Sequence, residues 1–75
     1  MSSANKERAR ARLQEVERLL RDAQGNVAVL RNRSDIQGQQ LLNAALKTNV
    51  ALQREFNDLD AKLKTRSDAQ WEALD

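Results

Sequence analysis

Residues 31–41, Arg-Asn-Arg-Ser-Asp-Ile-Gln-Gly-Gln-Gln-Leu, interrupt a helical apolar pattern that continues on either side of them. Within this segment Ser34 and Gln37 stand three positions apart, as S-x-x-Q. That spacing is typical of a capping box, in which the serine begins a helix and the glutamine bonds back to it. Asp35 would occupy the first turn, where the positive end of the helix dipole favours a carboxylate. The motif therefore predicts a turn at about 31–35 and a second helix beyond it.

The same segment also fits a single unbroken helix. Ser34 and Gln37 would then form a polar layer in the apolar seam, and each of the two glycines, Gly25 and Gly38, would cost about 1 kcal/mol of helix stability. Such a helix of about 70 residues would be roughly 105 Å long, and a hairpin about half that. The capping box favours the hairpin, and the long helix remains the alternative.

Apolar residues before the interruption are spaced as in a coiled coil. Steps of three and four residues connect Leu13, Val16, Leu20, Ala23, Val27 and Leu30, which is the a/d seam of a heptad repeat. After the interruption the apolar arc widens to about half of the helix circumference, at ~100° per residue. An arc of this width needs two neighbouring helices, so it predicts a three- or four-helix bundle. Small residues that would allow close approach there are Ala44, Ala45, Thr48 and Ala51.

Composition favours an all-α chain. Of 75 residues, 40% are hydrophobic and 32% charged, with two glycines, no proline and 3% aromatics. A lone chain of this size buries only about 60% of its unfolded surface, so its stability as a monomer would be marginal. We therefore expect one domain over residues 1–75, with helices at about 4–32 and 35–73. It would form a coiled coil or helical bundle and complete its core by oligomerising.

Residue types that are missing from the sequence narrow the possible functions. Without cysteine or histidine, zinc and haem sites, disulfides and Cys- or His-based catalysis are excluded. No glycine-rich phosphate loop is present either. We expect no enzymatic activity, no catalytic residues, no cofactor and no metal.

Hydropathy gives no sign of a membrane or secretory segment. The longest uninterrupted apolar run is residues 27–30, against the ~20 residues needed to cross a bilayer. Residues 1–6 contain no apolar core of a signal peptide. We expect a soluble, cytoplasmic protein.

Charge is distributed unevenly between the two halves of the chain. Residues 1–33 hold eight basic and four acidic groups, net +4, whereas residues 34–75 hold five basic and seven acidic groups, net −2. The halves should attract each other, which favours antiparallel contact within one chain or between two chains.

The wide apolar arc is the main candidate for a functional surface. A first helix can cover one flank of it, and the other flank, near Leu42, Leu46 and Val50, would stay uncovered. Trp71 either caps the end of the bundle or anchors a partner. We expect a protein–protein interaction module that acts in self-assembly or as an adaptor, chaperone-like cover or inhibitor. Its candidate interface residues are Leu41, Leu42, Leu46, Val50, Leu52, Phe56 and Trp71.

Basic residues near the N-terminus suggest a nucleic-acid-binding alternative. Lys6, Arg8, Arg10 and Arg12 are candidate phosphate ligands. No aromatic residue stands among them to stack on bases. The competing interpretation is a solvated helix end, or salt bridges to the acidic half of the chain.

One family resemblance follows from the glutamine within the seam. The seam from Leu13 to Leu41, with Gln37 at its centre followed by Gly-Gln-Gln, resembles the central layer of a glutamine-type SNARE helix. The resemblance implies a parallel four-helix bundle that draws membranes together through a buried Gln/Arg layer. The alternatives are a polar layer that only sets register, or a hairpin turn.

Overall fold

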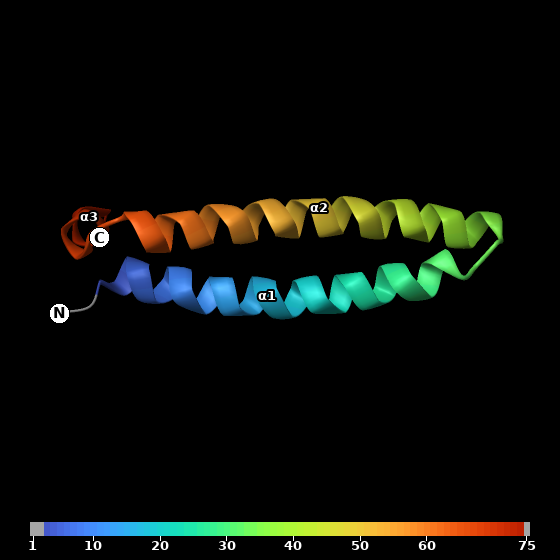
Figure 1. Ribbon diagram of the computed structural model, residues 1–75, viewed down its shortest axis with the longest axis horizontal. Helices are drawn as coiled ribbons and strands as arrows, with labels where there is room; N and C mark the ends of the chain where they lie inside the picture. The colour runs from blue at the N-terminus through green and yellow to red at the C-terminus, as the bar shows by residue number, and fades with distance from the viewer. Residues whose placement is uncertain (1–2, 75) are drawn as a thin grey trace.

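The computed structural model describes residues 3–74, and this part of the chain is helical without strands. Helix α1 (Ala4–Arg31) and helix α2 (Ile36–Thr65) lie antiparallel and side by side, and the short helix α3 (Asp68–Leu74) follows (Figure 1). The prediction of an all-α helical hairpin is confirmed, and the single long helix is wrong. Oligomerisation stays a prediction.

Asp35, and not Ser34, is the residue that precedes α2. It has an extended backbone, with φ −82° and ψ 159°, and its side chain makes no capping hydrogen bond. Its carboxylate instead accepts two hydrogen bonds from Arg33, at 3.1 Å from Nε and 2.9 Å from Nη2. The predicted capping box at Ser34 is therefore wrong. The charge-assisted bidentate pair favours the turn geometry that places Asp35 before α2.

Gly38 allows this turn to pack closely. It is one of only two buried residues on α2. A Cβ at this position would lie 2.6 Å from the Asp35 carboxylate and 2.8 Å from Cβ of Arg33, both closer than van der Waals contact permits. Gly25, in the middle of α1, would place a Cβ in open space. The two glycines therefore have different structural roles.

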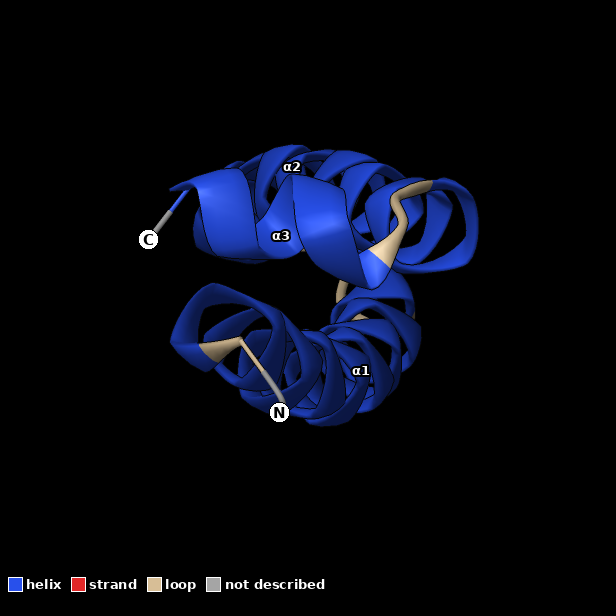
Figure 2. Ribbon diagram, turned by 90° about the vertical axis from the view of Figure 1, so that its left-hand side faces the viewer, coloured by secondary structure: helices blue, strands red, loops and turns tan. Residues whose placement is uncertain are grey.

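The predicted second helix over 35–73 is interrupted near its end. α2 stops at Thr65, and Arg66 is extended, with φ −83° and ψ 133°. Here an S-x-x-Q motif does form a capping box. The amide of Ser67 donates to Oε1 of Gln70 at 2.8 Å, and the amide of Gln70 donates to Oγ of Ser67 at 3.3 Å. The chain then turns, and α3 lies across the end of the hairpin that is opposite the turn (Figure 2).

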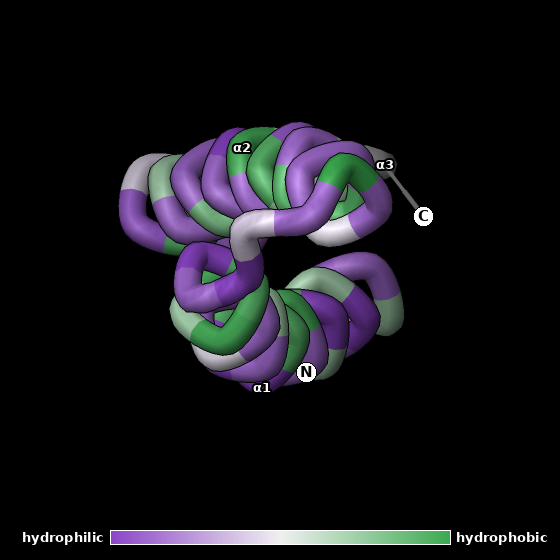
Figure 3. Tube along the Cα trace, turned by 90° about the vertical axis from the view of Figure 1, so that its right-hand side faces the viewer, coloured by the Kyte–Doolittle hydropathy of each residue, from purple (hydrophilic) through white to green (hydrophobic). Residues whose placement is uncertain are grey.

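The predicted a/d seam forms the buried stripe of α1. Its residues Val16, Leu20, Val27 and Leu30 are buried, and Val16 has no exposed surface at all. Near the turn, Val27 and Leu30 pack with Ala45 of α2 in a small core, and Leu42 and Leu46 pack against it. Seen from the turn, apolar and polar segments alternate along both helices, as amphipathic helices require (Figure 3).

The molecule is a rod with little interior. Its extents are 53 × 17 × 14 Å, and its radius of gyration is 16.5 Å. A compact domain of this length would have a radius of gyration of about 11 Å. The solvent-accessible surface is 5526 Å², whereas a compact monomer of this mass would expose about 4,700 Å². The hairpin thus leaves more surface open to solvent than a compact fold does.

Candidate protein-interaction surface

Helix α2 carries more apolar surface than α1 covers. Of the seven large apolar residues on α1, four are buried. None of the nine large apolar residues on α2 is buried to that degree. These nine are Ile36, Leu41, Leu42, Leu46, Val50, Leu52, Phe56, Leu59 and Leu63. A single neighbouring helix shields only the middle of a half-circumference arc, so the edges of the arc remain accessible.

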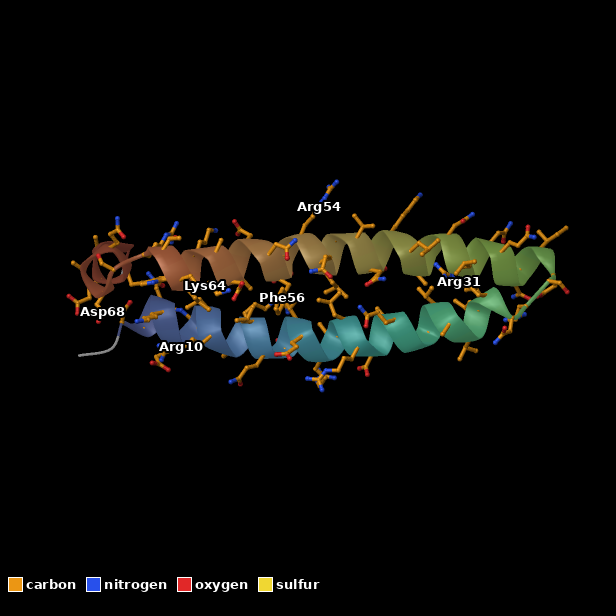
Figure 4. The ribbon with its side chains drawn as sticks, viewed as in Figure 1. Arg10, Arg31, Arg54, Phe56, Lys64 and Asp68 are labelled. Carbon is orange, nitrogen blue, oxygen red and sulfur yellow. The ribbon has the colours of Figure 1, made fainter. Side chains whose placement is uncertain are left out.

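Part of the arc faces α1. Leu52 and Phe56 are half-buried, and Figure 4 shows Phe56 between the two long helices. These two candidate interface residues therefore belong mainly to the hairpin's own packing. Each still exposes part of its side chain, because no third element covers the open sides of the helix pair.

Leu41 and Val50 mark the two edges of the arc. Leu41 is 45% exposed and Val50 is 53% exposed. They are nine residues apart, which at ~100° per residue places them on opposite sides of α2. Of the flank predicted to be uncovered, only Val50 is exposed, because Leu42 and Leu46 pack in part against the core beside the turn.

Trp71 closes the end of the hairpin. It is only 4% exposed, and the guanidinium carbon of Arg66 lies 5.0 Å from its ring centroid, within range of a cation–π interaction. Ser3 and Ala9, at the same end of α1, are also buried. The burial favours the end-cap interpretation, since a ring in this position has almost no surface to offer a partner.

The basic residues near the N-terminus are engaged within the chain. Nζ of Lys6 lies 2.6 Å from Oδ1 of Asp68, so it ties α1 to α3. The guanidinium of Arg12 bonds to the Glu55 carboxylate on α2 and lies 3.4 Å from Glu15. The pairs of Lys6 with Asp68 and of Arg12 with Glu55 join the basic and acidic halves, as the charge distribution predicts.

The remaining two basic candidates make local contacts. Nη2 of Arg8 donates to Oδ1 of Asn5 at 2.5 Å, and Nη1 of Arg10 lies 3.8 Å from Oε1 of Glu7. All four candidate phosphate ligands thus have partners in the hairpin. None of the pairings points to a shared anion site.

Gln37 lies at the surface. It is exposed in the first turn of α2, and the turn separates it from the seam of α1. The buried glutamine layer that the SNARE resemblance implies is therefore not formed within this hairpin.

Two further features bear on function. Over the range 3–74, the Asp and Glu side chains form no group of three that could hold a metal ion. Of the helices in the same range, none is sufficiently long and apolar to span a bilayer.

Sequence reasoning missed the scarcity of charge in the parts of α1 and α2 that lead into and out of the turn. Between residues 36 and 53, Lys47 is the only charged residue, and residues 23–30 of α1 have none. The four exposed large apolar residues among those whose burial the structure describes all lie in this half of the hairpin: Val29, Ile36, Leu41 and Val50. A count of charged residues along the sequence would have identified these two charge-poor segments, residues 23–30 and 36–53. Charge depletion is typical of the core of a protein–protein interface.

Comparisons with protein family models, with curated proteins and with solved structures found no match for this chain.

Proposed function

We propose that the chain is a helical protein–protein interaction module that binds through the apolar arc of α2. One observation carries this proposal: none of the nine large apolar residues on α2 is fully buried by the hairpin. Isolated apolar residues on a surface are ordinary, but nine along one helix that the hairpin leaves partly accessible favour a contact surface. The arc runs beside the small core at the turn, so a rigid helix pair presents it.

The character of this surface favours a protein over a nucleic acid. The stretch of α2 that carries the exposed apolar residues has one cation, Lys47, in 18 residues. Phosphate recognition needs clustered cations, and Lys6 and Arg12 of the basic end already hold the fold together. We therefore place the binding energy in apolar contacts of α2.

Site-specific photo-crosslinking in the native cell tests the proposal. A photoreactive residue in place of Val50 should form covalent adducts with a protein chain. The matched control is Gln14, which is exposed on α1; a photoreactive residue there should give no discrete adduct. No adduct from position 50, or equal adducts from both positions, would contradict the proposed function.

A further inference from the structure

We propose that the partner is a second copy of this chain, docked on the Val50 side of α2 so that two hairpins form a four-helix bundle. This inference rests on the proposed function and names its partner. We call the surface the Val50 flank. It consists of the apolar residues Leu42, Leu46 and Val50 and the amide residues Gln24, Asn49 and Gln53.

The hairpin's excess of exposed surface is about as large as the area that one bound copy would bury. The hairpin exposes 5526 Å², which is roughly 800 Å² more than a compact chain of its mass. A stable interface buries about 800 Å² on each partner. One copy of a 53 Å rod, laid alongside the first, can cover a strip of this order. The excess of exposed surface thus matches the area that each partner buries in a stable dimer.

The shape of the flank suits packing between helices. Leu42, Leu46 and Val50 follow one another at intervals of four residues. Side chains at this spacing form a ridge along a helix, and such ridges fit into the grooves of a neighbouring helix. A ridge that meets its own copy across a two-fold axis gives a closed dimer, which is the commonest symmetry of soluble oligomers.

The amide side chains of the flank can pair with amide side chains of a second copy. Gln24, Asn49 and Gln53 line a shallow hollow together with Val50. An amide side chain both donates and accepts hydrogen bonds, so two identical amides can bond to each other. A carboxylate or an ammonium group cannot pair with its own copy in this way. A flank whose polar residues are amides is therefore compatible with a two-fold contact.

The charges beside the flank give the dimer a distinctive salt response. Lys47 and Arg54 line an adjoining hollow with Leu46 and Val50, and neither has an ion pair among the described residues. Figure 4 shows Arg54 pointing away from α1. Two copies would bring like charges together at the rim, while their aliphatic stems lie along the apolar ridge. Salt should therefore tighten the dimer, whereas it would weaken binding of an acidic partner.

Sedimentation equilibrium of the full chain over a wide concentration range tests the inference. We expect the 8.5 kDa chain to convert to twice that mass as its concentration rises. Val50→Asp should raise the dissociation constant roughly tenfold or more. Val29→Asp is the matched control, because Val29 is a similarly exposed valine that lies on α1, outside the apolar arc, and this variant should dimerise like the parent. Neither substitution removes a buried side chain, so both variants should keep the parent's helical content at high concentration.

The second arm varies the salt. Raising it from about 10 mM to about 100 mM shortens the Debye length from about 30 Å to about 10 Å and should lower the dissociation constant. A parent that stays monomeric at every concentration overturns the inference, and so does a dimer that is broken by Val29→Asp but not by Val50→Asp. A dimer that salt weakens also overturns it.

The crosslinking experiment at position 50 distinguishes failure of the dimer inference from failure of the proposed function. An adduct to a different protein, formed by a chain that is monomeric in sedimentation, means that the module binds another protein and the second copy is wrong. The absence of any adduct from a monomeric chain contradicts both the inference and the proposed function.

Discussion

Arg12 on α1 and Glu55 on α2 are joined by two hydrogen bonds although 43 positions separate them in the chain. The guanidinium donates through both Nε and Nη2, and the Nη2–Oε1 distance is 2.9 Å. The pair connects the two long helices in the half of the hairpin that is remote from the turn. The hydrogen bonds from Arg12 hold the pKa of Glu55 below its ordinary value, and Lys6 does the same to the pKa of Asp68. Both pairs are open to solvent, so their contribution to stability is modest.

Acidification should therefore destabilise the hairpin. A carboxyl group whose pKa is lowered by folding binds its proton more tightly in the unfolded chain. Its stabilising effect is complete above its ordinary pKa and is lost as the pH falls through the lower, folded value. We expect the melting temperature to fall as the pH drops below 4.5, the ordinary value for Glu55, and then 3.8, that for Asp68. Circular dichroism melts across this range measure it.

Glu55→Gln provides the control for the acid response. It removes the charge that Arg12 pairs with, so the melting temperature at neutral pH should be lower than the parent's. Its decrease on acidification should be smaller, because one of the three carboxylates with a lowered pKa, which are Asp35, Glu55 and Asp68, is gone. An equal decrease in parent and variant would show that Glu55 does not contribute to the acid response.

The hairpin and the buried stripe of α1 could be predicted because apolar periodicity is a local property of the sequence. The sequence contains two S-x-x-Q motifs, and it could not be predicted from the sequence which of them forms a capping box. Ser34 and Ser67 each stand three residues before a glutamine, but only Ser67 forms a capping box. Near Ser34, the Arg33–Asp35 pair sets the turn instead. Near Ser67, Asp68 is held by Lys6, 62 positions away in the sequence. A motif of four residues carries no information about contacts between residues so far apart in the sequence.

The candidate surface was predictable in outline only. The width of the apolar arc on α2 follows from its residue spacing. Which edge of the arc stays exposed depends on how α1 lies against it, so the exposure of Leu41 and the partial burial of Leu46 could not be predicted. The burial of Trp71 depends in turn on the break between α2 and α3.

The two serines give a matched pair of substitutions. Ser67→Ala removes the hydroxyl that accepts from the Gln70 amide, and loss of such a cap costs about 0.5–2 kcal/mol. We expect α3 to detach more readily, seen as a shift of Trp71 fluorescence to longer wavelength at lower urea than in the parent. Ser34→Ala should leave stability and fluorescence unchanged, since Ser34 makes no capping bond. A destabilised Ser34→Ala variant would mean that Ser34 does cap α2.

The two glycines give a second matched pair. Gly25→Ala fills open space in the middle of α1 and should stabilise the hairpin by about 0.5–1 kcal/mol, because alanine is the better helix former. Gly38→Ala places a methyl group against Arg33 and Asp35, so the turn must shift and the gain should be lost or reversed. Urea denaturation followed by circular dichroism measures both. Equal stabilisation by the two substitutions would show that the turn does not need glycine.

Trp71 presents an apolar ring and an unused hydrogen-bond donor in the same buried position. Its Nε1 has no acceptor among residues 3–74, and a buried unpaired donor costs about 1–3 kcal/mol. Trp71→Phe removes that donor and keeps most of the ring, so we expect the stability to stay within about 1 kcal/mol of the parent's. Trp71→Ala removes the ring as well, and truncation of a buried aromatic residue costs about 3–5 kcal/mol in a core and less at a helix end. Chemical denaturation followed by helicity compares the three proteins. If phenylalanine costs as much as alanine, the indole N–H rather than the apolar ring holds α3 against α1, and an acceptor for it must exist.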